Sequence, residues 1–169
     1  MKTIKTIIIK TLPVMAGYLV LGFGFGIISL KNGYGFIWAL LMSLFIYAGS
    51  MQYVTISLLT SSAPLITTAL TTLMVNARHL FYGVSMIEQY KGSKGYKPYL
   101  IYGLTDETYS LVCTKENLYD IPYHKYCFLI TIFNHLYWLI GTVFRKLQNS
   151  IKSNFYFVLV LFLIHRAMV

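Results

Sequence analysis

The chain of 169 residues is apolar and basic, with 57% hydrophobic, 17% aromatic and only 11% charged residues, a mean hydropathy of +0.63 and a net charge of +9. This composition lies outside the range of soluble globular domains and predicts an all-α integral membrane protein in contact with the lipid bilayer. Nucleic-acid binding is not expected, because the basic residues form short clusters at the edges of apolar runs, where they meet lipid headgroups.

The first predicted helix covers residues 10–30. No small-x-small cleavage site precedes its end, so we expect a retained helix and not a removed signal peptide. Its glycines Gly22, Gly24 and Gly26 do not indicate a nucleotide-binding loop, because no strand precedes them. Two interpretations stay open: a small-residue face that lets another helix backbone approach, or a stretch where the helix opens beside a substrate.

The second predicted helix covers residues 36–60 and follows a turn over residues 31–35. Its hydroxyl side chains recur at helical spacing, and Gly49 and Ser50 lie in its middle. Gln52 follows on another face. Small and polar residues at this point favour either close helix packing, with the hydroxyls bonded to the preceding turn, or a kinked segment that faces a pore.

The third predicted helix covers residues 64–87, and its only strongly polar residues are Asn76, Arg78 and His79. An arginine near the middle of a bilayer costs about 2.5–3.5 kcal/mol on insertion scales, so it is tolerated where it faces protein, a cavity or a counter-charge. The pattern therefore predicts a central helix that carries a functional or pairing site. No metal is expected, because no set of Cys, His and carboxylate residues has ligand spacing.

The apolar run over residues 99–113 is interrupted by Asp106 and Glu107. It predicts either an exposed turn between two short segments or a transmembrane helix whose acids face the interior. In the second case Asp106 or Glu107 is the natural counter-charge for Arg78, because an unpaired buried ion costs several kcal/mol. An acid near His79 would also be a candidate proton site.

Another span is predicted over residues 126–144, and it contains Asn134 and His135. A polar stretch follows, and the last apolar run, over residues 155–164, is too short to cross a bilayer. The chain as a whole thus predicts about five transmembrane helices and an incomplete C-terminal apolar segment, with possible broken or re-entrant helices near Gly49 or Arg78.

Four short motifs occur in order between about residues 11 and 144: Pro13 with the glycines at 17, 22, 24 and 26; Tyr47-Ala48-Gly49-Ser50-Met51-Gln52 after Ser43; Asn76-x-Arg78-His79-x-x-Tyr82-Gly83; and Thr105-Asp106-Glu107. In these motifs the chain resembles the AzlC family of branched-chain amino acid permeases. The resemblance implies export of branched-chain amino acids or analogues by a multi-pass protein of a prokaryotic cytoplasmic membrane. It also implies a small AzlD-like membrane subunit as partner.

The resemblance covers residues 1–144 and leaves residues 145–169 as an atypical basic and apolar tail. Family members are typically longer, which suggests a truncated or frameshifted copy. The alternative to a working permease is then a transport-inactive membrane protein that still binds its partner. An enzyme is not expected, because no Ser/His or Cys/His pair has a spacing that argues for one, and no cofactor is expected either.

We expect alternating access, with Arg78 and helix N-termini facing the substrate carboxylate and Asp106 or Glu107 facing the ammonium. The candidate residues for substrate binding or coupling are Gly22, Gly24, Gly26, Gly49, Ser50, Gln52, Asn76, Arg78, His79, Asp106 and Glu107.

Overall fold

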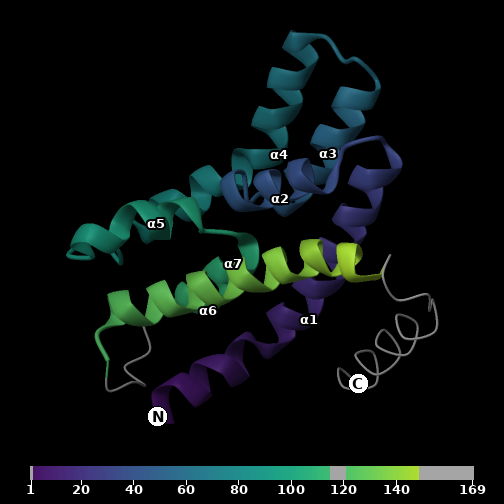
Figure 1. Cartoon of the computed structure of the whole chain (residues 1–169). Coiled ribbons are helices and arrows are strands. Elements are labelled where there is room, and N and C mark those ends of the chain that lie inside the picture. Colours follow the sequence, from purple (N-terminus) through teal and green to yellow (C-terminus); the bar gives the residue numbers. More distant parts are fainter. Residues whose placement is uncertain (1, 115–120, 149–169) are drawn as a thin grey trace. The chain divides into compact units, whose positions relative to one another are not determined.

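A computed structural model describes residues 2–114 and 121–148, and every regular element in those ranges is a helix (Figure 1). The elements in chain order are α1 (Lys2–Lys31), α2 (Phe36–Phe45), α3 (Gly49–Thr60), α4 (Leu65–Met86), the 3-10 helix η1 (Lys94–Tyr96), α5 (Lys97–Tyr102), α6 (Asp106–Val112) and α7 (Tyr123–Gln148).

Two stretches, Ile4–Lys31 and Tyr123–Phe144, are long and apolar enough to cross a bilayer. The all-α class is confirmed for the described residues, whereas the number of about five transmembrane helices stays a prediction. Helix α7 continues to Gln148, beyond the predicted end at residue 144. The predicted short apolar segment over residues 155–164 lies outside the described residues.

The chain divides into two compact units. One contains Met1–Leu12 and Ser57–Leu136, and the other contains Pro13–Ile56 and the part of α7 that begins at Tyr137. Helix α1 begins earlier than predicted and belongs to both units, and the boundary falls at Pro13 inside it. A proline inside a helix removes one backbone hydrogen bond and crowds the preceding turn, so a division at this residue is physically reasonable.

In the second unit, the prediction of a single helix over residues 36–60 is wrong. Helices α2 and α3 are separated by residues 46–48, and Tyr47 has a φ of +43°, which a residue with a Cβ rarely adopts. The buried Tyr47 ring packs edge-on against Tyr18, with ring centroids 6.5 Å apart. The structure thus has a break just before Gly49, as in the alternative of a kinked segment, and the buried Tyr47 ring packs at this break.

Gly49, the first residue of α3, lies against Trp138 of α7. A Cβ built on Gly49 would lie 3.0 Å from Cη2 of the indole ring. Trp138 in turn packs edge-on against Tyr18, with ring centroids 5.4 Å apart. The core of the second unit gathers around these rings and consists of Tyr18, Phe25, Ala39, Tyr47, Ile56 and Trp138.

In the first unit, the apolar run over residues 99–113 is not one helix. Helices α5 and α6 are separated by residues 103–105, and the side chain of Thr105 caps α6 by accepting a hydrogen bond from the Thr108 N–H. Part of the predicted loop before residue 99 is helical as well, as η1 and the start of α5. Gly103 lies in the break, where a Cβ would clash with the Thr131 methyl group of α7 at 2.2 Å.

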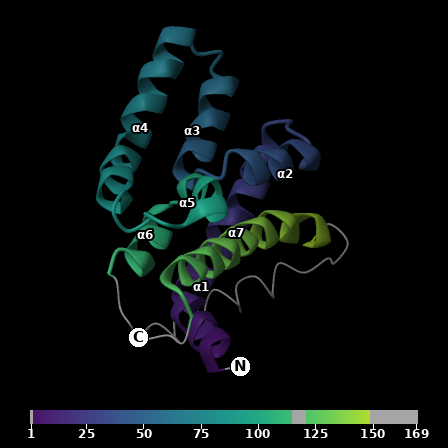
Figure 2. The ribbon, with the colours of Figure 1, turned by 90° about the vertical axis from the view of Figure 1, so that its left-hand side faces the viewer.

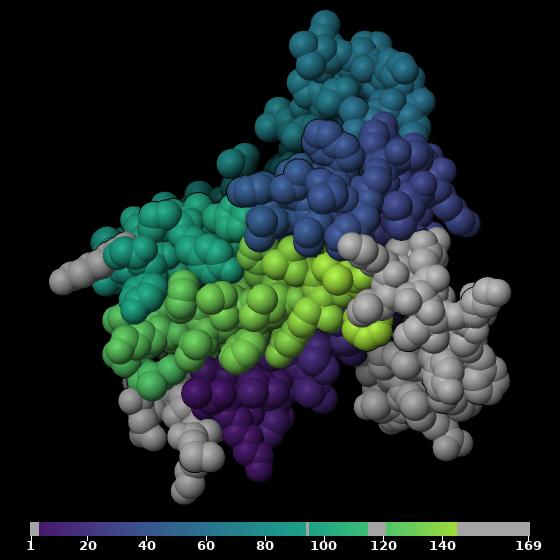
Figure 3. Space-filling model, viewed as in Figure 1, coloured from purple at the N-terminus to yellow at the C-terminus, as the bar shows by residue number. Residues whose placement is uncertain are grey.

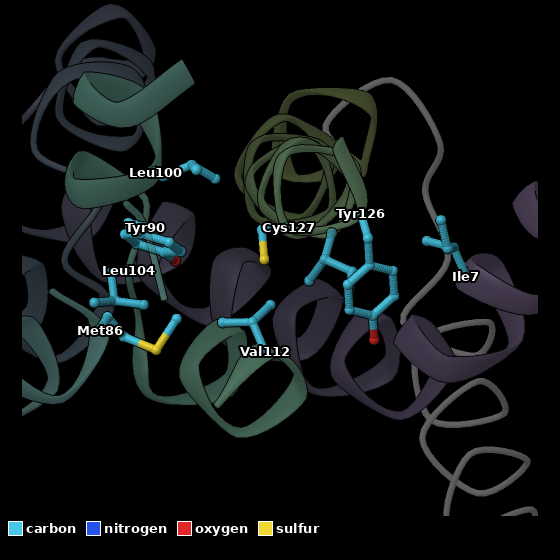
Figure 4. Packing of buried hydrophobic residues seen from close by; sticks show 9 residues of the cluster. Ile7, Met86, Tyr90, Leu100, Leu104, Val112, Tyr126 and Cys127 are labelled. Atoms are coloured by element: carbon cyan, nitrogen blue, oxygen red, sulfur yellow. The ribbon is translucent and has the colours of Figure 1, made fainter. Parts of the chain in front are cut away.

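The first unit has its own apolar core, to which α1, the end of α4, α5, α6, α7 and the adjoining loops contribute. Figure 4 shows its buried residues: Ile7, Met86, Tyr90, Leu100, Leu104, Val112, Tyr126, Cys127 and Ile130. The space-filling view shows α5 bordering the first half of α7 (Figure 3). Tyr99 contributes to this contact, because its ring lies edge-on to Phe128 with centroids 5.6 Å apart.

Candidate functional site

Arg78 of α4 forms an ion pair with Asp106, the first residue of α6. The Arg78 guanidinium donates a hydrogen bond from Nη1 to Oδ2 of the carboxylate, between residues 28 positions apart in the chain. Figure 2 shows α6 beside the C-terminal end of α4. The expectation that an acid of the 106–107 pair compensates Arg78 is confirmed, and Asp106 is that acid.

The break before α6 places this carboxylate. Thr105 fixes the first turn of α6, and Asp106 follows it directly, so the acid lies at the helix start, where backbone N–H groups favour a negative charge. The Arg78 and Asp106 side chains keep exposed fractions of 40% and 34%. The two side chains are therefore partly exposed, although Nε of Arg78 and Oδ1 of Asp106 are themselves buried.

The neighbouring predicted residues have local contacts. Nδ1 of His79 lies 3.3 Å from the backbone carbonyl of Asn76, and the His79 ring lies edge-on to Tyr82 with centroids 6.0 Å apart. Glu107 is half-buried, and its backbone carbonyl accepts a hydrogen bond from Ser110. The structure thus brings Asn76, Arg78 and His79 of α4 together with the start of α6.

Two tyrosines next to the ion pair were not among the predicted site residues. The rings of Tyr82 on α4 and Tyr109 on α6 stack with centroids 4.5 Å apart and an interplanar angle of 15°. Ser85 donates a hydrogen bond of 3.1 Å to the Tyr109 hydroxyl. Tyr82 follows Arg78 by four residues and Tyr109 follows Asp106 by three, which are the spacings of one helix face, and these spacings are the signal that could have identified the tyrosines.

A polar cluster on α7 connects α5 and α6 to that helix. The fully buried Asn134 donates a hydrogen bond of 3.0 Å from Nδ2 to Oγ1 of Thr108. Next to it, Nδ1 of His135 lies 3.0 Å from the Tyr99 hydroxyl. Sequence reasoning noted Asn134 and His135 in a predicted span but assigned them no partner.

The second unit contains a neutral hydrogen-bonded network. The buried Gln52 donates a hydrogen bond of 3.2 Å from Nε2 to Oγ of Ser43, and Ser43 lies 3.0 Å from Oγ1 of Thr142. This network joins α2, α3 and α7. Among the predicted site residues of this unit, Gln52 is part of the network, whereas Ser50 is exposed on α3.

The glycines of α1 have packing roles. A Cβ on Gly22 would lie 2.8 Å from the Trp138 carbonyl oxygen, and a Cβ on Gly24 would lie 2.8 Å from the Tyr53 hydroxyl. Gly26 is buried, and α1 runs unbroken through all three glycines. The approach of another helix backbone is confirmed at Gly22, whereas Gly24 contacts a side chain. The alternative prediction, that α1 opens at these glycines, is wrong.

The family model for the AzlC protein matches residues 13–147. The branched-chain amino acid transport protein AzlC of Bacillus subtilis is 40% identical over 145 residues, which cover 85% of this chain and 57% of that protein. An uncharacterized membrane protein of Helicobacter pylori is 38% identical over 150 residues, which cover 89% of this chain and 66% of that protein. The inner membrane protein YgaZ of Escherichia coli is 30% identical over 109 residues, which cover 62% of this chain and 44% of that protein.

The chain spans 57% and 66% of the length of the first two of these relatives. No solved structure matches it. Because the family model covers most of the chain, including both broken helices and the Arg78–Asp106 pair, the chain belongs to the AzlC family.

Proposed function

We propose that this chain is a multi-pass membrane permease that exports branched-chain amino acids or their analogues. Family membership and the name of the Bacillus subtilis relative support amino-acid transport. The structural observation that carries the proposal is the ion pair between Arg78 and Asp106, because its two charges are the complements of those of a free amino acid.

A free amino acid carries a carboxylate and an ammonium group on the same carbon. The planar Arg78 guanidinium suits the carboxylate, because its N–H donors match two carboxylate oxygens. The Asp106 carboxylate suits the ammonium. When the substrate binds, one internal ion pair is replaced by two pairs with the ligand. Neither protein charge is left uncompensated at any stage, which matters because an unpaired ion in a low-dielectric site costs several kcal/mol.

This exchange of partners gives a basis for alternating access. The ion pair joins α4 to α6 directly, whereas a bound zwitterion would have to lie between them. Binding therefore favours a different spacing of α4 and α6, as expected when a ligand has unequal affinity for two conformations. The substrate gradient then sets the direction of transport. A small AzlD-like membrane subunit is the proposed partner.

The test is efflux of labelled leucine from cells that express the chain together with such a subunit. Arg78→Ala and Asp106→Asn are compared with wild type at matched abundance. Glu88→Gln is the control, because it removes the carboxylate of an exposed ion pair, with Lys91 Nζ 2.6 Å from Glu88 Oε1, outside the site. We expect efflux by wild type and Glu88→Gln and at least a tenfold loss in the other two variants.

A reversed pair, Arg78→Asp with Asp106→Arg, separates substrate binding from a structural role. Reversal keeps the charges compensated, but the two groups then face the wrong ends of the substrate. We expect restored abundance without restored efflux. Wild-type efflux by the reversed pair or by both single variants, or no efflux by wild type, would contradict the proposal.

A further inference from the structure

The stacked pair of Tyr82 and Tyr109 lies directly beside the Arg78–Asp106 ion pair. Tyr82 is one helical turn after Arg78 on α4, and Tyr109 is one turn after Asp106 on α6. The Tyr82 ring also lies edge-on to the ring of His79, the residue after Arg78, with centroids 6.0 Å apart. The charged pair and the aromatic pair thus form two adjacent layers between the same two helices.

The polar end of Tyr109 already has a protein partner, because its hydroxyl accepts a hydrogen bond from Ser85. What the pair can offer a ligand is therefore the apolar surface of its rings, and both side chains keep intermediate exposure. Such a surface favours a hydrocarbon group and disfavours a polar one, whose hydrogen-bonding groups would be left without partners.

We propose that Tyr82 and Tyr109 form the subsite for the substrate side chain and set the size of the side chain that the permease accepts. This inference rests on the proposed function. If Arg78 and Asp106 hold the carboxylate and the ammonium, the α-carbon lies at the charged layer. The next layer lies about one helical turn away, roughly 5.4 Å along α4. A leucine or isoleucine side chain extends across most of that distance toward the two rings, whereas the shorter valine side chain reaches less far.

A purely structural stack would behave differently. If the rings only hold α4 to α6, losing one lowers abundance or slows transport of every substrate by the same factor. If the rings form the subsite, changing one alters the ranking of substrates. One missing or added methylene in an apolar site is worth roughly 10–200-fold in discrimination, so the ranking is a sensitive readout.

The experiment compares efflux of labelled leucine, valine and phenylalanine for wild type, Tyr109→Ala and Tyr109→Trp, with the small membrane subunit present and at matched abundance. Tyr109→Ala removes a ring, so we expect the phenylalanine-to-leucine ratio to rise at least tenfold. Tyr109→Trp adds volume, so we expect the leucine-to-valine ratio to fall about tenfold. The two variants change the site in opposite directions, so either one tests the inference if the other fails to accumulate.

Two further variants control for indirect effects. Tyr109→Phe keeps the ring and should keep the wild-type ranking. Ser110→Ala removes a hydroxyl at the neighbouring position of α6, where it donates a hydrogen bond of 2.8 Å to the backbone carbonyl of Glu107, and should also keep the wild-type ranking. An unchanged ranking in the variants that accumulate, with wild-type transport intact, overturns the inference and leaves the proposed function standing. A wild-type chain that moves no amino acid overturns both.

Discussion

Both units of this chain pack a pair of short helices against α7, but they use different side-chain interactions to do so. Each contains a pair of short helices with a break between them, and each break lies against α7 where a glycine permits close approach, Gly49 at Trp138 in one unit and Gly103 at Thr131 in the other. Each is also joined to α7 by side-chain hydrogen bonds, from Ser43 in one and from Thr108 in the other.

Only the first unit adds an ion pair between its helices, Arg78 with Asp106, among the contacts of the described residues. Neutral groups can hold a broken helix in place, as Ser43 and Thr142 do in the second unit. Charged groups are expensive in a membrane, so their presence indicates a task beyond packing. The comparison therefore supports the proposal that a charged ligand binds in the first unit.

The largest effect is expected from Asp106→Leu, which leaves Arg78 without its counter-charge. Breaking a fully buried pair costs about 3–5 kcal/mol, and we expect about 2–3 kcal/mol because the two side chains keep 40% and 34% exposure. Leucine efflux should be abolished. Thermal unfolding of purified protein and efflux from cells measure the two effects. Unchanged stability would show that the pair contributes nothing to holding α4 and α6 together.

The next largest effect is expected from Gly22→Ala, which tests the packing of α1 against α7 in the second unit. Gly17→Ala on the same helix is its matched control. A Cβ on Gly22 would meet the Trp138 carbonyl at 2.8 Å, whereas a Cβ on Gly17 has no atom within 4 Å. We expect Gly22→Ala to destabilise by about 1–3 kcal/mol and Gly17→Ala to stabilise by up to about 1 kcal/mol. Equal melting temperatures for the two variants would contradict the close contact between α1 and α7.

A smaller effect is expected from Gln52→Met in the neutral network. The amide oxygen of Gln52 is buried without a hydrogen-bond partner among the described residues, and Ser43 keeps its contact with Thr142 when the amide is removed. Loss of one hydrogen bond is offset by loss of an unsatisfied acceptor, so we expect a change within about 1 kcal/mol. Lost transport at normal stability would instead assign Gln52 to the substrate site and weaken the contrast between the units.

The smallest effect is expected from Glu88→Gln. It removes the carboxylate that pairs with Lys91, and both side chains are largely exposed, with fractions of 73% and 68%. Exposed pairs contribute about 0–1 kcal/mol, and we expect a change below about 0.5 kcal/mol in thermal unfolding. A loss as large as that of Asp106→Leu would mean that charge alone, and not its place beside α4 and α6, explains the first prediction.

The predicted parts of the site share one property: they follow from the cost of a charge. Arg78 in an apolar run requires a counter-charge, and residues 106–107 carry the nearest acids in a following apolar run, so the pairing could be predicted without coordinates. The choice between Asp106 and Glu107 could not, because it depends on where α6 begins. Tyr82 and Tyr109 were missed as site residues because an aromatic residue in a membrane helix carries no such cost.

The sequence by itself determined that the solvent is a bilayer, that the described chain is helical, that Arg78 needs a partner, and which family the chain resembles. These conclusions depend on hydropathy, charge and spacing, which are properties of short segments. Only the tertiary structure decided where the helices break and which glycines pack against backbone. The break at residues 46–48 packs against Tyr18 and Trp138, and Trp138 follows Gly49 by more than half the length of the chain, so no local pattern contains this contact. The physical reason is that a helix break is stable only when distant side chains occupy the space that it opens.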